Sequence, residues 1–360
     1  MKLIHVVGTR PNFMKIAPIM RVAYKYDTIQ QVLVHTGQHY DDYMSKWFFE
    51  ELGISEPDIN LEVGSGTHGE QTGEIMKRFE RFLIEEGGDV ILVVGDVNST
   101  IACGLVASKL HIPLAHVEAG LRSFDRRMPE EINRLLTDAI SDYLFTPAEE
   151  ANMNLKAEGI PEEKIYLVGD VMIDTLIWEM ERTQKLDEPP FEDLKNREYA
   201  VLTLHRPSNV DVPETFRGIM KALNTIAEDI EIIFPAHPRT KSKMKEFQIY
   251  PGNDNIRITD PLSYRDFLKL YKNSIFVLTD SGSIQQETTY LNIPCLTIRE
   301  NTERPFTISK GTNILVGVGP EKIVVESKKI LDGEVKKSKG FPLWDGKSAE
   351  RIVEILYKDF

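Results

Sequence analysis

Residues 89–96 read DVILVVGD, in which five consecutive apolar residues are followed by Gly95 and Asp96. A continuous apolar run is typical of a strand that is buried on both faces, as in a parallel sheet. The segment that follows, NSTIACGLVASKL (98–110), has the pattern of a helix. A buried strand that leads through a short turn into a helix is the repeating unit of an α/β domain.

Similar strand patterns recur along the chain in two series. Besides DVILVVGD, the first contains KLIHVVGT (2–9), QVLVHTG (31–37), IPLAHVEAG (112–120), DYLFTPA (142–148) and KIYLVGD (164–170). The second contains YAVLTLH (199–205), IEIIFPAH (230–237), NIRITDP (255–261), SIFVLTDSG (274–282), IPCLTIR (293–299) and TNILVG (312–317). Residues 183–198, rich in charge and with paired prolines, have the composition of a linker. We therefore predict two Rossmann-like α/β domains, residues 1–170 and 171–345.

The bulk composition narrows the classes of function. Lys+Arg 43 and Asp+Glu 56 give a formal net charge of −13, which argues against a nucleic-acid-binding protein. No apolar run is long enough to span a membrane, and the N-terminal residues lack the features of a signal peptide, so we expect a cytoplasmic protein. Cys103 and Cys295 lie far apart among apolar residues and are expected to be buried, reduced thiols.

The loops that follow the predicted strands are rich in acids, Arg, His, Gly and Ser. In doubly wound sheets, ligands bind beyond the carboxyl ends of the strands. If the two domains face each other with these ends inward, a polar central cleft forms between them. The ligand-binding and catalytic residues are therefore expected in these loops.

In the second domain, TDSGSIQQETTYLNIP (279–294) turns from a strand into a helix at Ser281, Gly282 and Ser283. The free N–H groups of a helix start bind phosphate, and Gly282 permits a close approach of the backbone. Glu287, six residues after Ser281, would accept the hydroxyls of a ribose. The alternative is an ordinary serine N-cap.

Cationic residues follow three other strands. Arg10 and Lys15 flank a predicted helix start, where they oppose the helix dipole unless an anion binds there; the alternative is solvated surface charge. His205 with Arg206, and His237 with Arg239, are candidates for binding phosphate or donating protons. A structural role is also open for His237. None of these histidines has the spacing of a zinc site, and we predict no metal.

Acids gather at strand and helix ends of the first domain. Asp96 and Glu118 follow strands, and Glu130, with Glu131 beside it, falls in the first turn of a helix. Together with Arg122 and Arg134 they suggest a site of proton transfer, in which Arg134 pairs with Glu130 four residues earlier. Compensation of the helix dipole is the alternative for Glu130 and Glu131.

Gly64, Gly66 and Gly69 have the spacing of a dinucleotide-binding loop. The strand before them is short, however, and the strand-end acid Asp96 comes later than that motif expects. A nicotinamide cofactor is therefore disfavoured.

The motifs GTRPNFMK, TGQH, GDVNST, HVEAGLR, MPEEINR, HRPSN, DSGSIQQE and TERP occur in this order on the predicted strands. In this the sequence resembles the non-hydrolysing UDP-N-acetylglucosamine 2-epimerases from Met1 to about residue 317. The resemblance implies a glycosyltransferase-B-like fold and a homodimer. It also implies a C-terminal helix (346–360) that packs back on the first domain, and interconversion of UDP-GlcNAc and UDP-ManNAc without nicotinamide or metal.

The resemblance also implies roles for individual residues. Catalysis would involve Asp96, Glu118, Glu130, His205, Lys15 and Arg134. The UDP-sugar would be bound by Arg10, His205, Arg206, His237, Ser281, Gly282, Ser283, Glu287 and Arg304. In bacterial members the region after the Gln-His pair, here Gln38 and His39, holds an activating second nucleotide. Tyr40 stands here where those members have arginine, which leaves activation of this chain open.

Several loops depart from the usual family pattern. Ser283 stands where many members have glycine, and Pro207-Ser208-Asn209 follows Arg206. These departures leave open a modified substrate, such as a 2,3-diacetamido uronic acid. A glycosyltransferase of the same architecture and a non-catalytic UDP-sugar sensor are further alternatives.

Overall fold

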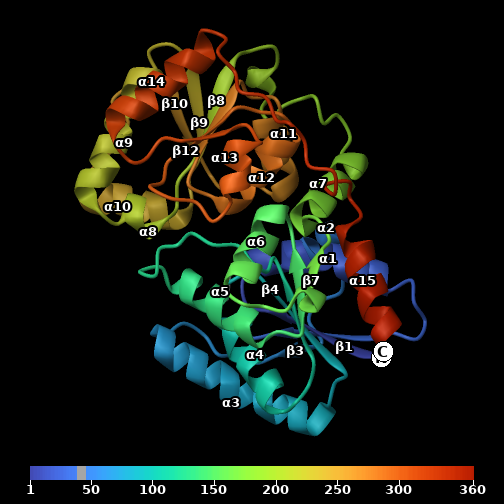
Figure 1. The fold of residues 1–360 in the computed structure, drawn as a ribbon. Coiled ribbons are helices and arrows are strands. Elements are labelled where there is room, and N and C mark those ends of the chain that lie inside the picture. Colours follow the sequence, from blue (N-terminus) through green and yellow to red (C-terminus); the bar gives the residue numbers. More distant parts are fainter. Residues whose placement is uncertain (39–45) are drawn as a thin grey trace. The chain divides into compact units, whose positions relative to one another are not determined.

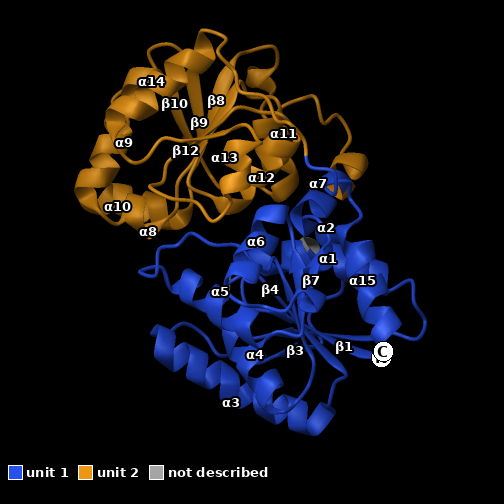
Figure 2. Ribbon diagram, in the orientation of Figure 1, with its two compact units in different colours: residues 1–177, 341–360 blue, residues 178–340 orange. Residues whose placement is uncertain are grey.

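The computed structural model describes residues 1–38 and 46–360 and divides the chain into two compact units (Figures 1 and 2). Unit 1 comprises Met1–Ile177 and Phe341–Phe360, and unit 2 comprises Trp178–Gly340. Each unit contains one parallel sheet with helices. The prediction of two Rossmann-like α/β domains is confirmed.

The sheet of unit 1 has seven parallel strands in the order β3-β2-β1-β4-β5-β6-β7. Its strands are β1 (Lys2–Val7), β2 (Gln30–His35), β3 (Ile59–Asn60), β4 (Val90–Val94), β5 (Leu114–Val117), β6 (Tyr143–Thr146) and β7 (Ile165–Leu167). Its helices are α1 (Arg10–Ala23), α2 (Lys46–Leu52), α3 (His68–Glu86), α4 (Asn98–Lys109), α5 (Pro129–Ile140), α6 (Glu149–Ala157), the 3₁₀ helix η1 (Glu162–Lys164), the first part of α7 (Val171–Arg182) and α15 (Ser348–Asp359).

Strand β4 lies near the middle of this sheet, and every one of its side chains is buried. Helices α3, α4 and α5 pack in succession on one side of the sheet, and α1 packs against α15 on the other (Figure 1). Because both faces are covered, the strand needs an unbroken apolar sequence rather than an alternating one. The pattern of residues 89–96 thus has a direct physical cause.

The C-terminal segment is held to unit 1 by specific hydrogen bonds. The carboxylate of Asp174 accepts from the backbone N–H groups of Ser348 (3.2 Å) and Ala349 (2.7 Å) at the start of α15. The Trp344 indole donates to the Pro147 carbonyl (3.2 Å). Since Asp174 and its neighbours on α7 serve unit 1, the boundary falls after Ile177 and not after residue 170 as predicted.

The sheet of unit 2 has six parallel strands in the order β10-β9-β8-β11-β12-β13. They are β8 (Tyr199–Thr203), β9 (Glu231–Pro235), β10 (Ile256–Thr259), β11 (Phe276–Thr279), β12 (Cys295–Thr297) and β13 (Asn313–Leu315). The helices are η2 (Glu192–Leu194), α8 (Pro207–Val210), α9 (Pro213–Ile226), α10 (Pro238–Phe247), α11 (Tyr264–Lys272), α12 (Gly282–Tyr290), α13 (Pro305–Ser309) and α14 (Pro320–Leu331).

The prediction of a linker at residues 183–198 is wrong. This stretch belongs to unit 2, where Asp187 pairs with Lys272, and Asp193 pairs with Arg257 (2.6 Å). Asn273 also donates to the Leu186 carbonyl (3.0 Å). The charges that suggested a solvated linker instead fasten the segment to helix α11 and strand β10.

Each sheet has one point at which the strand order reverses. In unit 1, β1 lies between β2 and β4, and in unit 2, β8 lies between β9 and β11. Loops after these neighbouring strands lead away in opposite directions and leave room for a ligand. The predicted site residues after β1, β4, β8 and β11 therefore gather at the two switch points. Within the described residues, no helix is both long and apolar enough to cross a bilayer.

Candidate active site

The loop after β1 is fastened to the end of β4. The side-chain oxygen of Asn12, which is buried, accepts from the backbone N–H groups of Gly8 (3.1 Å) and Thr9 (3.0 Å). Its amide nitrogen donates to the Val94 carbonyl (3.2 Å). The two strand ends at the switch point of unit 1 are thus held together by one side chain. Arg10, at the first position of α1, is half-buried.

Lys15 and Glu118 form an ion pair beside this loop. The Lys15 ammonium contacts the Glu118 carboxylate, and the two residues are 8 % and 4 % exposed. Glu118 has φ 68°, a left-handed conformation that costs a non-glycine residue on the order of 1–3 kcal/mol. A Cβ atom on Gly95 would lie 3.0 Å from the Lys15 nitrogen, so the glycine lets the backbone pass close to the pair. Strained backbone of this kind is typical of functional sites.

Asp96 is held by Arg134. One guanidinium nitrogen of Arg134 contacts the Asp96 carboxylate, and another donates to Glu131 (2.6 Å). The predicted pairing of Arg134 with Glu130 is therefore wrong, and Glu131, one residue later, takes that place. The physical reason is the preceding turn, where Ser123 and Phe124 also donate their N–H groups to Glu131 (2.9 Å each) and draw its carboxylate inward.

The two adjacent acids on α5 thus have different environments. Glu131 is 1 % exposed and saturated with donors, which outweigh the effect of burial and lower its pKa. Glu130 is half-buried in the first turn of α5. Glu131 therefore stabilises the turn, while Glu130 remains the candidate for contact with a substrate. Arg122, which we had grouped with the proton-transfer residues, is buried between Asp138 (2.7 Å) and Glu158 (2.6 Å).

At the switch point of unit 2, Asp280 organises the loop after β8. Its buried carboxylate accepts from the backbone N–H groups of His205 (3.1 Å) and Arg206 (2.9 Å) and from the Asn209 amide (3.1 Å). The His205 ring nitrogen Nδ1 lies 3.0 Å from the same carboxylate, and the imidazole is 44 % exposed. Burial would raise the pKa of Asp280, but these contacts lower it. Asp280 thus orients His205 with Nε2 as its outer nitrogen.

Helix α12 begins at Gly282, directly after the N-cap residue Ser281. No side chain of the described residues caps this helix start, so its first N–H groups remain available for an anion. The hydroxyls of Ser281 and Ser283 lie 3.3 Å apart beside it. A Cβ atom on Gly282 would lie 2.6 Å from a guanidinium nitrogen of Arg304, so any larger residue here would displace the Arg304 and Glu303 side chains.

Three arginines surround one glutamate next to this helix start, and we call them the arginine cluster: Arg206, Arg299 and Arg304 around Glu303. Glu303 is contacted by Arg304, by Arg299 (2.7 Å) and more distantly by Arg206 (3.6 Å). Although burial acts to raise it, these cations hold the pKa of Glu303 well below its usual value. Three guanidinium groups against one carboxylate leave a formal charge of +2 at the start of α12.

Arg299 carries part of this excess positive charge in a buried position. It is 4 % exposed, and its Nη1 has no hydrogen-bond partner among the described residues. Burial lowers its pKa, as expected for a guanidinium whose charge is only partly compensated. A buried charged donor of this kind is suited to binding an anion.

Glu287 lies on the inner side of α12 and is 1 % exposed. Its carboxylate accepts from the hydroxyls of Tyr271 (2.6 Å) and Tyr264 (3.2 Å). Burial raises the pKa of Glu287 to about 7, against the opposing effect of the two tyrosines. A pKa raised to near neutrality thus belongs to the side chain for which the sequence predicts contact with a ribose.

His237 and the segment after Gln38 are the remaining predicted positions. Nδ1 of His237 accepts from the Arg239 backbone N–H (3.2 Å) and so caps α10, although its ring lies 6.4 Å from that of His205. The structural role that the sequence left open for His237 is thus filled by Nδ1. The segment after Gln38, where an activating nucleotide would bind, falls in residues 39–45, outside the described residues.

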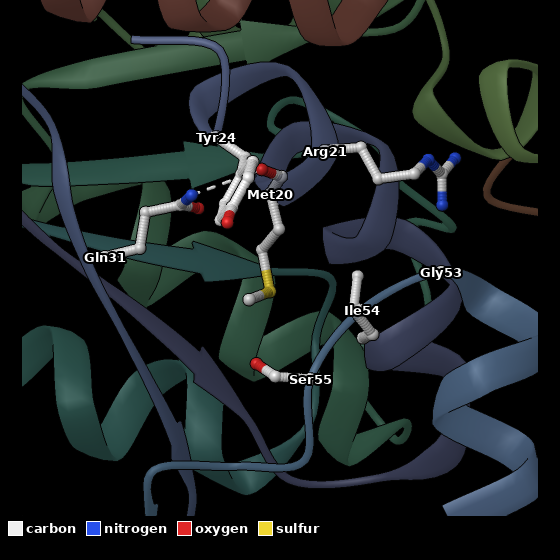
Figure 3. Close-up of a pocket in the computed structure, with 7 residues that line it drawn as sticks. All are labelled: Met20, Arg21, Tyr24, Gln31, Gly53, Ile54 and Ser55. Carbon is white, nitrogen blue, oxygen red and sulfur yellow. Dashed lines mark hydrogen bonds between the residues drawn. The ribbon is translucent and has the colours of Figure 1, made fainter. Parts of the chain in front are cut away.

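A hollow of about 420 Å³ in unit 1 lies away from these residues (Figure 3). It is lined by Met20, Arg21, Tyr24, Gln31, Gly53, Ile54 and Ser55. Met20 and Arg21 belong to the last turn of α1, Tyr24 is its C-cap, and Gln31 lies at the start of β2, the end opposite the carboxyl ends of the strands. The other three follow α2. Arg21 donates to the Leu52 carbonyl (2.5 Å) and Gln31 to the Met20 carbonyl (3.2 Å), so both serve the backbone of the protein itself.

Sequence reasoning missed Asp280, Arg299 and Glu303. Asp280 and Arg299 both follow buried strands, so the rule that ligands bind at strand ends would have found them. Arg299 and Arg304 lie in the same loop as Glu303, but nothing local indicates that Arg206, from the loop after β8, joins them. Among the described residues, no group of three or more His, Cys, Asp or Glu side chains is arranged to hold a metal ion.

Comparisons with known proteins identify the family of the chain. Residues 23–357 match the family described as UDP-N-acetylglucosamine 2-epimerase. The chain is 47 % identical to the UDP-N-acetylglucosamine 2-epimerase of Methanocaldococcus jannaschii over 99 % of both chains. It is 39 % identical to the UDP-2,3-diacetamido-2,3-dideoxy-D-glucuronate 2-epimerase of Pseudomonas aeruginosa, over 99 % of this chain and 100 % of that one.

A solved structure is also similar over the whole chain. The M. jannaschii UDP-GlcNAc 2-epimerase in complex with UDP-GlcNAc and UDP has a TM-score of 0.89 and 46 % identity, covering 99 % of this chain and 100 % of that chain.

Proposed function

The chain belongs to the UDP-N-acetylglucosamine 2-epimerase family, and from this premise we propose that it interconverts UDP-N-acetylglucosamine and UDP-N-acetylmannosamine. The proposed enzyme inverts C2 of the sugar while UDP departs and returns. We further propose that it works as a cytoplasmic homodimer, and sedimentation velocity would test the dimer.

The chemistry of C2 explains why the nucleotide must leave. The C2 proton is too weakly acidic for direct removal at neutral pH. When the C1–O bond to UDP breaks, positive charge develops at C1, and a carboxylate can then take the C2 proton. The products of this step are 2-acetamidoglucal and UDP. Return of a proton to the other face of C2, with re-addition of UDP to C1, completes the exchange.

The observation that carries the proposal is the pairing of Glu118 with Lys15 and of Asp96 with Arg134 at the ends of adjoining strands β5 and β4. A reaction that removes and returns a proton on opposite faces needs more than one acid–base group. Glu130, at the start of α5, supplies a third carboxyl group. We assign these three acids as a group and leave their division between the two faces of C2 open.

Unit 2 would bind the leaving group. The arginine cluster, His205 and the start of α12 present positive charge and N–H donors, which would stabilise the diphosphate as its charge increases. Glu287 would receive the ribose hydroxyls.

The direct test is to incubate the purified protein with UDP-N-acetylglucosamine alone and follow the products by NMR. We expect UDP-N-acetylmannosamine to form until the two sugars reach equilibrium. A glycosyltransferase without an acceptor would give only slow hydrolysis, and a sensor would bind without turnover. Either of these results would contradict the proposal.

A modified substrate is the second candidate, because the relative at 39 % identity acts on a UDP-2,3-diacetamido uronic acid by name. The same experiment with that sugar measures the preference. We expect the higher kcat/KM for UDP-N-acetylglucosamine, since the relative with that name is more similar at 47 %.

The protonation of Glu287 predicts how UDP binding depends on pH. Because its pKa is raised to about 7 in the free protein, Glu287 is largely protonated below that pH and ionised above it. Ribose hydroxyls donate best to the ionised carboxylate, so UDP affinity should rise between about pH 6 and pH 8, by up to roughly tenfold. Titration calorimetry over this range measures the rise.

The control for this prediction is 2′,3′-dideoxy-UDP, which retains the phosphates and meets the same His205. The affinity of the protein for 2′,3′-dideoxy-UDP should lack the additional rise with pH. The Glu287→Gln variant should bind UDP and 2′,3′-dideoxy-UDP with the same pH dependence. Equal pH profiles for UDP and its dideoxy analogue in the unsubstituted protein would exclude Glu287 as the ribose acceptor.

A further inference from the structure

A buried histidine lies close to the candidate acids Asp96 and Glu118 of unit 1. His116 belongs to β5, two residues before Glu118, and is 0 % exposed. Its Nε2 lies 2.8 Å from the carbonyl oxygen of Gly95, the residue before Asp96. Its Nδ1 lies 2.6 Å from the carboxylate of Asp138 on α5. One side chain therefore connects the two strand ends that carry the candidate acids.

The hydrogen bonds of His116 determine its protonation. A carbonyl oxygen can only accept, so Nε2 must carry a proton. The other oxygen of Asp138 accepts from the Gly120 N–H (3.0 Å) and from Arg122 (2.7 Å). Both contacts favour an ionised Asp138. An ionised carboxylate can only accept, so the Asp138 oxygen that faces Nδ1 of His116 requires a proton on that nitrogen as well. With hydrogens on both ring nitrogens, His116 is an imidazolium.

The charges around His116 agree with this assignment. The network comprises His116, Arg122, Asp138 and Glu158, in which Glu158 binds Arg122 through two hydrogen bonds (2.7 and 2.6 Å). With a charged histidine the network is neutral overall, and with a neutral one it holds an uncompensated negative charge. Burial acts to raise the pKa of Asp138, but His116 and Arg122 outweigh it and the pKa is lowered.

The same network fixes the backbone next to both acids. Gly95 has φ 69°, Glu118 has φ 68° and Gly120 has φ 78°, so three residues of these turns are in the left-handed region. His116 holds the carbonyl of the first, and Asp138 holds the N–H of the third. Strained turns persist only where the surroundings fix them.

We propose that buried His116 donates from both ring nitrogens, as an imidazolium, and through Gly95 and Asp138 is the positioning residue for Asp96 and Glu118. It touches no reacting atom in this account. The positioning role rests on the proposed function, whereas the protonation state does not. A neutral amide at this position would satisfy at most one of the two contacts as a donor and could not balance Asp138.

The first experiment is NMR of the ligand-free protein labelled with ¹⁵N in its histidines, with His116→Gln to assign the signal. We expect both ring nitrogens of His116 to be protonated at pH 7, each donating to its oxygen partner. His5 provides the internal control, since it is equally buried but its pKa is lowered to about 4 by burial. It should be neutral in the same spectra. A neutral His116 at pH 7 would overturn the proposal.

The second experiment measures the positioning role in His116→Gln and Asp138→Asn, with His5→Gln as the matched buried control. We expect kcat to fall by about 10-fold to 10²-fold in the first two variants, because small displacements of reacting groups have effects of this size. KM and the affinity for UDP should change less than about twofold, since UDP is bound by unit 2. Unchanged kcat, or an equal loss of UDP affinity, would contradict the positioning role.

The two experiments separate this inference from the proposed function. If the unsubstituted protein binds UDP but epimerises no sugar, the proposed function fails, while the NMR spectrum still decides the charge of His116. If the protein is active and His116 is neutral, only the inference fails. Thermal denaturation of each variant shows whether kcat was measured on folded protein.

Discussion

Glu118→Gln and Asp96→Asn are each expected to lower kcat for UDP-N-acetylglucosamine by at least about 10²-fold, the scale of a positioned general acid or base. Both changes keep the shape of the side chain and remove its ability to take a proton. The affinity for UDP should be almost unchanged, because the nucleotide would be held by unit 2. Steady-state kinetics and calorimetry with UDP measure the two quantities. Near-normal kcat in both variants would show that Glu118 and Asp96 are not the acid–base groups of the mechanism.

The neighbouring acids on α5 provide a matched control for this prediction. Glu130→Gln should lower kcat with no change in stability, since its side chain is half-buried in the first turn. Glu131→Gln should lower the free energy of unfolding by roughly 3 kcal/mol, because it leaves the buried Arg134 partly unpaired. Denaturant unfolding separates the two effects. The reverse result, a stability loss in Glu130→Gln only, would show that the roles are exchanged.

Arg304→Gln is expected to weaken UDP binding by about 10-fold to 10²-fold, the scale of a lost charge-assisted hydrogen bond at a partly desolvated site. Arg304 lies at the start of α12, where a Cβ atom on Gly282 would touch it. Arg304→Lys keeps the charge without the planar fork and should give an intermediate loss. Arg299→Gln should also weaken binding, because its free Nη1 would no longer meet the anion.

Uridine distinguishes a lost phosphate contact from a damaged fold. It lacks the diphosphate, so its weaker binding should be the same in the unsubstituted protein and in Arg304→Gln. Arg197→Gln is the matched control, since Arg197 is half-exposed in unit 2 and pairs with Glu231 (3.0 Å) away from α12. Parallel losses of uridine and UDP affinity would assign Arg304 to the fold and not to the diphosphate.

The strands could be predicted from the sequence because burial on both faces of a sheet produces a pattern in consecutive residues. A buried parallel strand such as β4 is apolar along its whole length, and the residue after it begins a loop at the ligand-binding edge. Asp96, Glu118, His205 and Ser281 could therefore be chosen from position alone. Their pairing with particular partners could not.

The errors arose where contacts are distant in sequence. Asp187 and Asp193 have the composition of a linker, and only the folded chain brings them to Lys272 and Arg257. Arg134 was expected to pair with the residue four positions earlier on the helix. The turn at Ser123 instead draws Glu131 inward, and Asp96 arrives from another strand. The donors of Asp280 likewise come from the distant segment His205–Asn209, and Arg206 of the same segment joins Arg299 and Arg304 at Glu303.

The central claim is that the C2 proton leaves the sugar and is replaced from solvent while UDP is detached. The most direct measurement is epimerisation of UDP-N-acetylglucosamine in D₂O, followed by NMR of the recovered sugars. The account predicts that UDP-N-acetylmannosamine formed in D₂O carries deuterium at C2. Conversion to UDP-N-acetylmannosamine with the original hydrogen fully retained at C2 would contradict it.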